Sequence, residues 1–130
     1  MDSSVFLSHY LAEERSAEAS TLIRGCRSIV ASRVTEVEVR RGLSFIDSPV
    51  TRVTAQAAFA HESQGFFIME MDAVLTDLAA TIAETSRMRT LDSLHIAAAI
   101  LADADAFLTF DRRQGTVARQ FDLTVVGVST

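Results

Sequence analysis

Four acidic side chains stand at positions from which they could form one metal site: Asp2, Glu38, Asp92 and Asp111. Three of them lie near predicted strand ends or helix starts, where an open parallel sheet collects its ligand-binding residues. Two like charges about 4 Å apart repel by roughly 4 kcal/mol at an effective dielectric constant near 20. Four clustered carboxylates must therefore take up protons or bind a divalent cation. A ligand set made only of oxygen favours Mg²⁺ or Mn²⁺ over Zn²⁺.

Each acid also has a purely local interpretation. Asp92 and Asp111 stand at predicted helix starts, where carboxylates cap free N–H groups and the helix dipole favours negative charge. Glu38 is placed to pair with Arg41 on a solvated helix face. Taken singly, each residue favours the local interpretation, so the metal site depends on the fold bringing the acids together.

Two kinds of apolar segment alternate along the chain and predict the elements that must position these acids. Short β-branched or aromatic runs predict strands at residues 28–31, 66–69, 106–109 and 123–128. Longer amphipathic stretches predict helices at residues 4–13, 16–25, 33–45, 51–62, 72–87, 91–104 and 112–121. This alternation is typical of an α/β fold in which helices cover both faces of a parallel sheet.

Apolar residues repeat every three or four positions in two of the predicted helices, and these repeats predict the faces that cover the sheet. In helix 72–87 the repeat consists of Val74, Leu78 and Ile82. In helix 91–104 it consists of Leu91, Leu94, Ala98 and Leu101.

The start of the chain departs from the alternation. A strand is expected before helix 4–13, yet only Met1 and Asp2 precede Ser3. We therefore expect either a fold that tolerates a truncated first strand, or several apolar residues encoded upstream of Met1.

Composition limits the possible functions. The chain has 130 residues, 48% hydrophobic and 22% charged, which suits one folded domain over residues 1–130. Its net charge of −5 argues against a protein that coats nucleic acid through a broad basic surface. A nuclease is still compatible with that charge, because a bound cation and a few arginines are enough to hold a phosphodiester. All 12 basic residues are Arg, and the lack of Lys excludes Schiff-base chemistry and the P-loop.

The sequence also indicates where the protein is located and whether its cysteine is reactive. No apolar run approaches the ~20 residues that cross a bilayer, and the chain does not open with a secretion signal, so we expect a cytoplasmic protein. Cys26 is the single cysteine and has no neighbour at metal-ligand spacing, which predicts a packed, unreactive thiol.

Four segments of this sequence together resemble a known family. They are DSSV at 2–5, SRVTEVEVRRGL at 32–43, RTLDSLHIAAA at 89–99 and FLTFDRR at 107–113. In order and spacing they are similar to the motif blocks of PIN-domain proteins, specifically the VapC-type toxins of bacterial toxin–antitoxin pairs. The resemblance spans essentially the whole chain, and its most specific part is RTLDSLHIAAA followed by LTFD.

This resemblance implies a three-layer α/β/α PIN-like fold with a short parallel sheet and a truncated first strand. It also implies a Mg²⁺- or Mn²⁺-dependent endoribonuclease that hydrolyses RNA phosphodiester bonds. By the same resemblance Asp2, Glu38, Asp92 and Asp111 hold one or two metal ions, and the hydroxyl groups of Ser4 and Thr109 line the pocket.

The neighbouring residues complete the expected site. Arg112 and Arg113 follow Asp111 and are suited to RNA phosphate contacts, although solvated charge at a helix start explains them equally well. Glu36 falls outside the motif and is expected to pair with Arg40 four residues later. The family resemblance further implies a cognate antitoxin as protein partner, and a homodimer.

Two other functions share some of these features. A receiver-type phosphoacceptor shares the chain length and an acidic pocket, but it requires paired acids near its first strand and a lysine, and this chain has neither. The second is a catalytically silent binding module of the PIN fold. Retention of all four acids argues against it.

Overall fold

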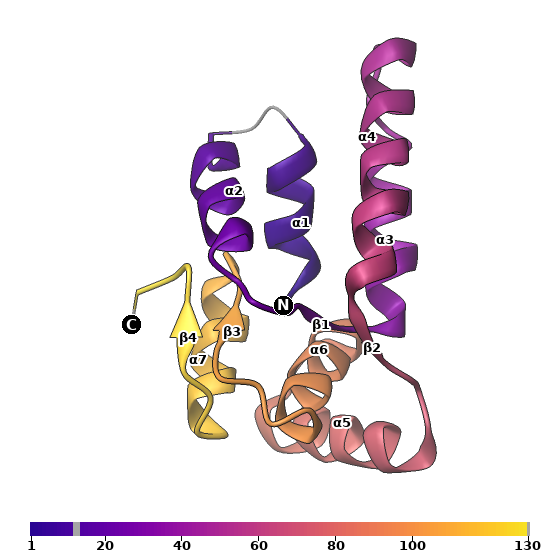
Figure 1. The fold of residues 1–130 in the computed structure, drawn as a ribbon. Helices are drawn as coiled ribbons and strands as arrows, with labels where there is room; N and C mark the ends of the chain where they lie inside the picture. The colour runs from indigo at the N-terminus through magenta and orange to yellow at the C-terminus, as the bar shows by residue number, and fades with distance from the viewer. Residues whose placement is uncertain (12–13, 130) are drawn as a thin grey trace.

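A computed structural model describes residues 1–11 and 14–129 of the chain (Figure 1). Its helices are α1 (Ser3–Tyr10), α2 (Ser16–Arg24), α3 (Arg33–Leu43), α4 (Pro49–Glu62), α5 (Ala73–Ser86), α6 (Thr90–Leu101) and α7 (Arg112–Gln120). The short strands are β1 (Val30–Ser32), β2 (Phe67–Met69), β3 (Phe107–Leu108) and β4 (Val125–Val126), and a 3₁₀ turn, η1 (Ser63–Gly65), follows α4. Among the helices described, none combines the length and apolar character needed to cross a membrane.

Capping residues in the sequence determine where several helices begin and end. Ser48 accepts the backbone N–H of Thr51, and Pro49 occupies the first position of α4, where its missing N–H has no cost. Asp72 caps α5 by accepting a backbone N–H. Arg87 ends that helix in the left-handed conformation, with φ of 49°.

The strands form two parallel pairs, β1 with β2 and β3 with β4. The backbone of Met1 and Asp2 runs between the two pairs: the Met1 nitrogen donates to Val30 O at 2.9 Å and the Asp2 N–H donates to Leu108 O at 2.9 Å. Successive N–H groups that donate to opposite sides are the pattern of a central parallel strand. Two residues therefore occupy the position where the alternation predicts a first strand.

Every predicted strand and helix has a counterpart, so the expected α/β class is confirmed. The strands are shorter than expected, most of all the predicted strand 123–128, of which only Val125–Val126 pairs. The strands lie in two parallel pairs, and hydrogen bonds of residues 1 and 2 connect one pair to the other. The predicted end of helix 4–13 at residues 12–13 lies outside the described residues.

Aromatic rings and short aliphatic side chains fill the core. Helix α5 packs along α6, while α1 packs against both α2 and α3 (Figure 1). Phe6 of α1 is 1% exposed, and its ring stacks on Phe66 with centroids 5.0 Å apart. This packing holds α1, which begins directly after Asp2, against α3, which carries Glu38.

The predicted core faces of two helices need correction. In α5 the buried residues are Leu75, Ala79 and Ile82, whereas Val74 is 63% exposed. In α6 every residue from Ser93 to Ala99 is buried, but Leu91 and Leu101 at the ends are exposed. The periodicity therefore identified Ile82 in α5 and Leu94 and Ala98 in α6 correctly as core residues, and it was wrong for Val74, Leu91 and Leu101.

Candidate functional site

The four predicted acids come from four separate elements. Asp2 caps α1 and Asp111 caps α7, each by accepting a backbone N–H. Asp92 lies in the first turn of α6, and Glu38 lies in the middle of α3. Asp2 bonds through its N–H to Leu108, the last residue of β3, and Asp111 follows Leu108 by three residues. The site therefore forms at the carboxyl ends of the strands.

Gln114 links two of the acids from inside the protein. Its amide Nε2 lies 3.3 Å from Asp2 Oδ1 and 3.2 Å from Asp92 Oδ1. Its Oε1 accepts from the Thr109 hydroxyl at 2.7 Å, and the Gln114 side chain is fully buried. Since a primary amide has two N–H donors, one Gln side chain serves both carboxylates without adding charge.

Arg89 links a further pair at the surface. Its Nε donates to Asp92 Oδ2 at 2.7 Å, and its Nη2 donates to Asp111 Oδ2 at 3.2 Å. The Arg89 side chain is 69% exposed. One guanidinium therefore neutralises part of the charge that two carboxylates bring together.

His95 connects Glu38 to the same network. The ring Nε2 lies 2.5 Å from Glu38 Oε1 and 3.7 Å from Asp2 Oδ1. Ser3 donates its hydroxyl to Glu38 Oε1 at 2.8 Å. His95 is buried, so it forms the floor of the site. Through Gln114, Arg89 and His95, all four predicted acids belong to one network of polar contacts.

Burial and local partners shift two of the carboxyl groups in opposite directions. Burial raises the pKa of Asp92 above its ordinary value and outweighs the opposing effect of the Arg89 guanidinium. Burial would also raise the pKa of Glu38, but the combined hydrogen bonds and charge of its partners, chiefly His95, lower the pKa below the ordinary value. The lowered pKa favours the carboxylate form of Glu38, whereas burial disfavours the charged form of Asp92.

The two predicted pocket hydroxyls both contact Asp2. Ser4 Oγ donates to Asp2 Oδ2 at 2.5 Å and accepts the backbone N–H of Phe110 at 3.1 Å. Thr109 Oγ1 is buried, lies 3.2 Å from Asp2 Oδ2, and accepts the backbone N–H of Asp111 at 3.0 Å. These contacts fix the orientation of the Asp2 carboxylate relative to β3 and α7.

The arginines around Asp111 differ in their contacts. Arg112 and Arg113 are exposed at the start of α7, and Arg113 donates to the backbone carbonyl of Arg87. The guanidinium that contacts the acids belongs to Arg89. In the sequence Arg89 stands three residues before Asp92, a spacing that places two side chains on one helix face.

The chain is similar to one protein family and to a solved structure. The model of the PIN domain family matches residues 1–120, a range that includes all four acids. The chain belongs to the PIN domain family. Among solved structures, "Crystal Structure of FitAcB from Neisseria gonorrhoeae" superposes with a TM-score of 0.75 at 16% identity, covering 95% of this chain and 93% of that chain. At that identity the likeness supports the fold. No curated protein matches the chain.

The acidic residues of this PIN domain fit a hard divalent cation by type. All four are carboxylates, and the hydroxyls beside them are oxygen donors too. Within residues 1–11 and 14–129, however, no three Asp, Glu, His or Cys side chains are grouped as a ready-made metal site. N–H donors of Gln114 and Arg89 contact the oxygen atoms that a cation would use. Entry of a cation therefore requires some of these contacts to be exchanged.

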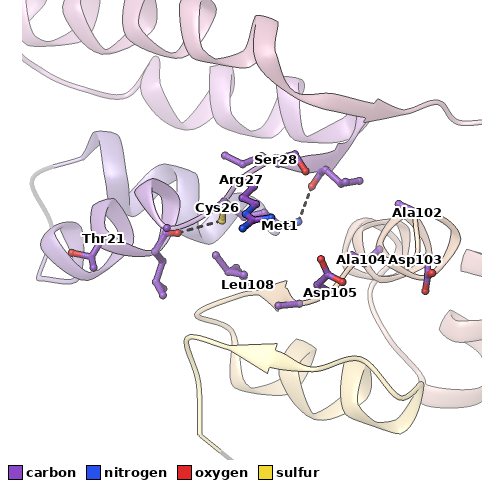
Figure 2. Close-up of a pocket in the computed structure, with 16 residues that line it drawn as sticks. Met1, Thr21, Cys26, Arg27, Ser28, Ala102, Asp103, Ala104, Asp105 and Leu108 are labelled. Carbon is purple, nitrogen blue, oxygen red and sulfur yellow. Dashed lines mark hydrogen bonds between the residues drawn. The ribbon is translucent and has the colours of Figure 1, made fainter.

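A cavity of about 560 Å³ lies at the opposite edge of this PIN domain, near the amino ends of β1 and β3. Figure 2 shows Met1, Cys26, Arg27 and Asp105 around it. The Cys26 thiol donates a hydrogen bond to the backbone carbonyl of Leu22. None of the four predicted acids lines it. The cavity is therefore separate from the acidic site.

Proposed function

We propose that this PIN domain is a metal-dependent endoribonuclease of the VapC type, the toxin of a type II toxin–antitoxin pair, acting on RNA phosphodiester bonds. The observation that carries the proposal is the single polar network that joins Asp2, Glu38, Asp92 and Asp111. Membership of the PIN family adds support, because PIN domains are generally nucleases. The range that the family model matches includes all four acids.

Asp2, Glu38, Asp92 and Asp111 would hold Mg²⁺ or Mn²⁺. When bound, such an ion supplies Lewis-acid activation of water and neutralises charge on the phosphodiester. The protein's part is to keep the carboxylates converged. Ser4 and Thr109 orient Asp2, and His95 with Ser3 orients Glu38.

Residues of the site would also accept a hydrogen bond from the attacking water or bind the substrate. Glu38 is ionised at neutral pH because its pKa lies below the ordinary value, so it is able to accept a hydrogen bond from an attacking water. Arg112 and Arg113, exposed beside Asp111, would contact RNA phosphates through their guanidinium groups. The rest of the surface is acidic overall, which keeps RNA contacts local to the site.

The proposed partners are RNA, a cognate antitoxin and a second copy of the chain, in the cytoplasm. A protein partner is supported by large apolar side chains exposed on α3, α4 and the turn between them. These are Val37, Phe45, Val50 and Val53, which are between 61% and 77% exposed. Covering such a surface with another protein removes apolar area from water, which lowers the free energy.

The alternative is a PIN-fold binding module without catalysis. An RNA cleavage assay with Mg²⁺ or Mn²⁺ on the chain and its Asp92→Asn variant separates the two. We expect Asp92→Asn to lose about a hundredfold or more of the activity, because one metal ligand is neutralised. The matched control is Asp77→Asn, an exposed acid on α5, which should cleave like the original chain.

A chelator should abolish cleavage by the unmodified chain, and returning Mn²⁺ should restore it. Each variant is first shown to melt like the original chain, so that a loss reports on chemistry. No metal-dependent cleavage of any RNA would support the silent module. Cleavage that survives Asp92→Asn unchanged would show that the activity does not come from the acidic site.

A further inference from the structure

The groups that hold the four acids together differ sharply in burial. Gln114 is fully buried, whereas the Arg89 side chain is 69% exposed. Both contact Asp92, Gln114 through Oδ1 and Arg89 through Oδ2. One carboxylate is therefore bound on one oxygen by an interior amide and on the other by a surface guanidinium.

Gln114 is fixed at both ends. Its backbone N–H donates to Asp111 Oδ1 at 2.9 Å as part of the α7 cap, and its Oε1 accepts the Thr109 proton. Removing the amide from its place would leave buried polar groups without a hydrogen-bond partner, which is unfavourable in free energy. Gln114 therefore stays between Asp2 and Asp92 whatever occupies the rest of the site.

Arg89 has no comparable anchor. It precedes α6 with an extended backbone, and every side-chain contact described for it is to Asp92 or Asp111. Exposed ion pairs of this kind contribute little to stability, since water solvates both partners when they separate. The two oxygens that Arg89 contacts are also oxygens that a divalent cation would take.

We propose that Arg89 is an exchangeable counter-charge that leaves Asp92 and Asp111 when a divalent cation enters, while Gln114 is a permanent positioning residue for Asp2 and Asp92. The inference rests on the proposed metal-dependent function. Without the ion, Arg89 offsets repulsion between carboxylates that the fold forces together. With the ion present, the same oxygens receive a double positive charge and the guanidinium is released.

The two residues then affect metal binding with opposite signs. Removing Arg89 removes a competitor, so the cation should bind more tightly. Removing the amide of Gln114 releases Asp2 and Asp92 from their shared donor, so the cation should bind more weakly. General damage to the fold cannot produce the first of these effects.

The test is calorimetric titration of the metal-free protein with Mn²⁺ at low salt, together with its melting temperature without metal. We expect Arg89→Ala to bind Mn²⁺ about three- to tenfold more tightly, the range that one or two exposed ion pairs represent. We expect Gln114→Met, which keeps the side-chain length, to bind about tenfold or more weakly. Arg40→Ala removes a similarly exposed arginine, paired with Glu36 on α3, and should match the original chain.

Equal or weaker Mn²⁺ binding by Arg89→Ala would overturn the proposal that Arg89 is displaced by the cation. This measurement is decisive by itself, because an exposed side chain can be removed without opening the core. Normal binding by a folded Gln114→Met would overturn the positioning role. If the original chain binds and cleaves with Mn²⁺ while Arg89→Ala behaves identically, only this inference fails. If the original chain does not bind Mn²⁺, the proposed function fails with it.

Discussion

His95 Nε2 and Glu38 Oε1 lie 2.5 Å apart, although the two residues are separated by 57 positions in the chain. The contact joins α6 to α3 beneath the acidic site, and the His95 side chain is only 1% exposed. A buried imidazole in contact with a half-buried carboxylate stabilises the fold and orients a candidate metal ligand at once. Its loss should therefore be visible in both stability and activity.

We predict that His95→Ala lowers the free energy of unfolding by about 1–3 kcal/mol, because Glu38 and Ser3 lose a buried hydrogen-bond partner. Urea denaturation measures the change. His61→Ala, an exposed histidine at the end of α4, is the control and should stay within about 0.5 kcal/mol of the original chain. Equal stabilities of the two variants would show that the His95 contact carries no energy.

Gly127 approaches the site from β4. Its φ is +109°, and a Cβ added there would lie 2.4 Å from the backbone oxygen of Thr109. We predict that Gly127→Ala destabilises the protein by about 1–3 kcal/mol through backbone strain, and lowers RNA cleavage by displacing the Thr109 hydroxyl. Thermal melts and the cleavage assay report the two effects.

Gly65→Ala is the matched control for that substitution, since a Cβ at Gly65 would meet nothing within 4 Å. It should leave melting and cleavage unchanged. If Gly127→Ala behaves in the same way as Gly65→Ala, the close approach to Thr109 has no energetic consequence.

Tyr10 is the only tyrosine, so its ionisation can be followed directly by ultraviolet absorbance. Burial, and then its hydrogen bond to Glu62 at 2.6 Å, raise the pKa of the phenol well above its ordinary value of 10.0. Because the folded protein retains this proton more tightly than the unfolded chain, the stability it contributes is fully present below pH 10 and is lost as the pH rises further. We predict that absorbance change and unfolding coincide above pH 10.

Glu62→Gln removes the negative charge beside the phenol. It should bring the Tyr10 transition to lower pH and leave RNA cleavage unchanged, because Glu62 is not one of the four acids of the site. A Tyr10 transition near pH 10 in the folded original chain would contradict the prediction.

The bonds of Met1 and Asp2 lead to a prediction about a lengthened chain. Burial lowers the pKa of the Met1 ammonium from 8.0 to about 6, so a charge is unfavourable between β1 and β3. Four apolar, β-branched residues added before Met1 should continue the parallel ladder into the adjoining cavity. We predict a melting temperature about 5 °C higher, equivalent to roughly 1 kcal/mol. An added Gly-Ser segment of equal length is the control, and equal gains from both would refute strand formation.

Much of this protein was predictable from local sequence. Helix starts follow capping residues such as Ser48 and Asp72, whose side chains act within three residues of themselves. The pairing of Glu36 with Arg40 is confirmed for the same reason, because positions four apart on a helix are always neighbours. The identity of the four acids also came from the sequence, through the order and spacing of the motif blocks.

Only the tertiary structure decided what lies between those acids. Gln114 and Arg89 have ordinary positions in the sequence, and their contacts to Asp2 and Asp111 depend on how α6, α7 and the start of the chain pack together. The same holds for α5, where Leu75 and not Val74 faces the core. Local patterns determine which residues form helices and strands, whereas contacts between elements far apart in sequence depend on the relative rotation and depth at which those elements settle.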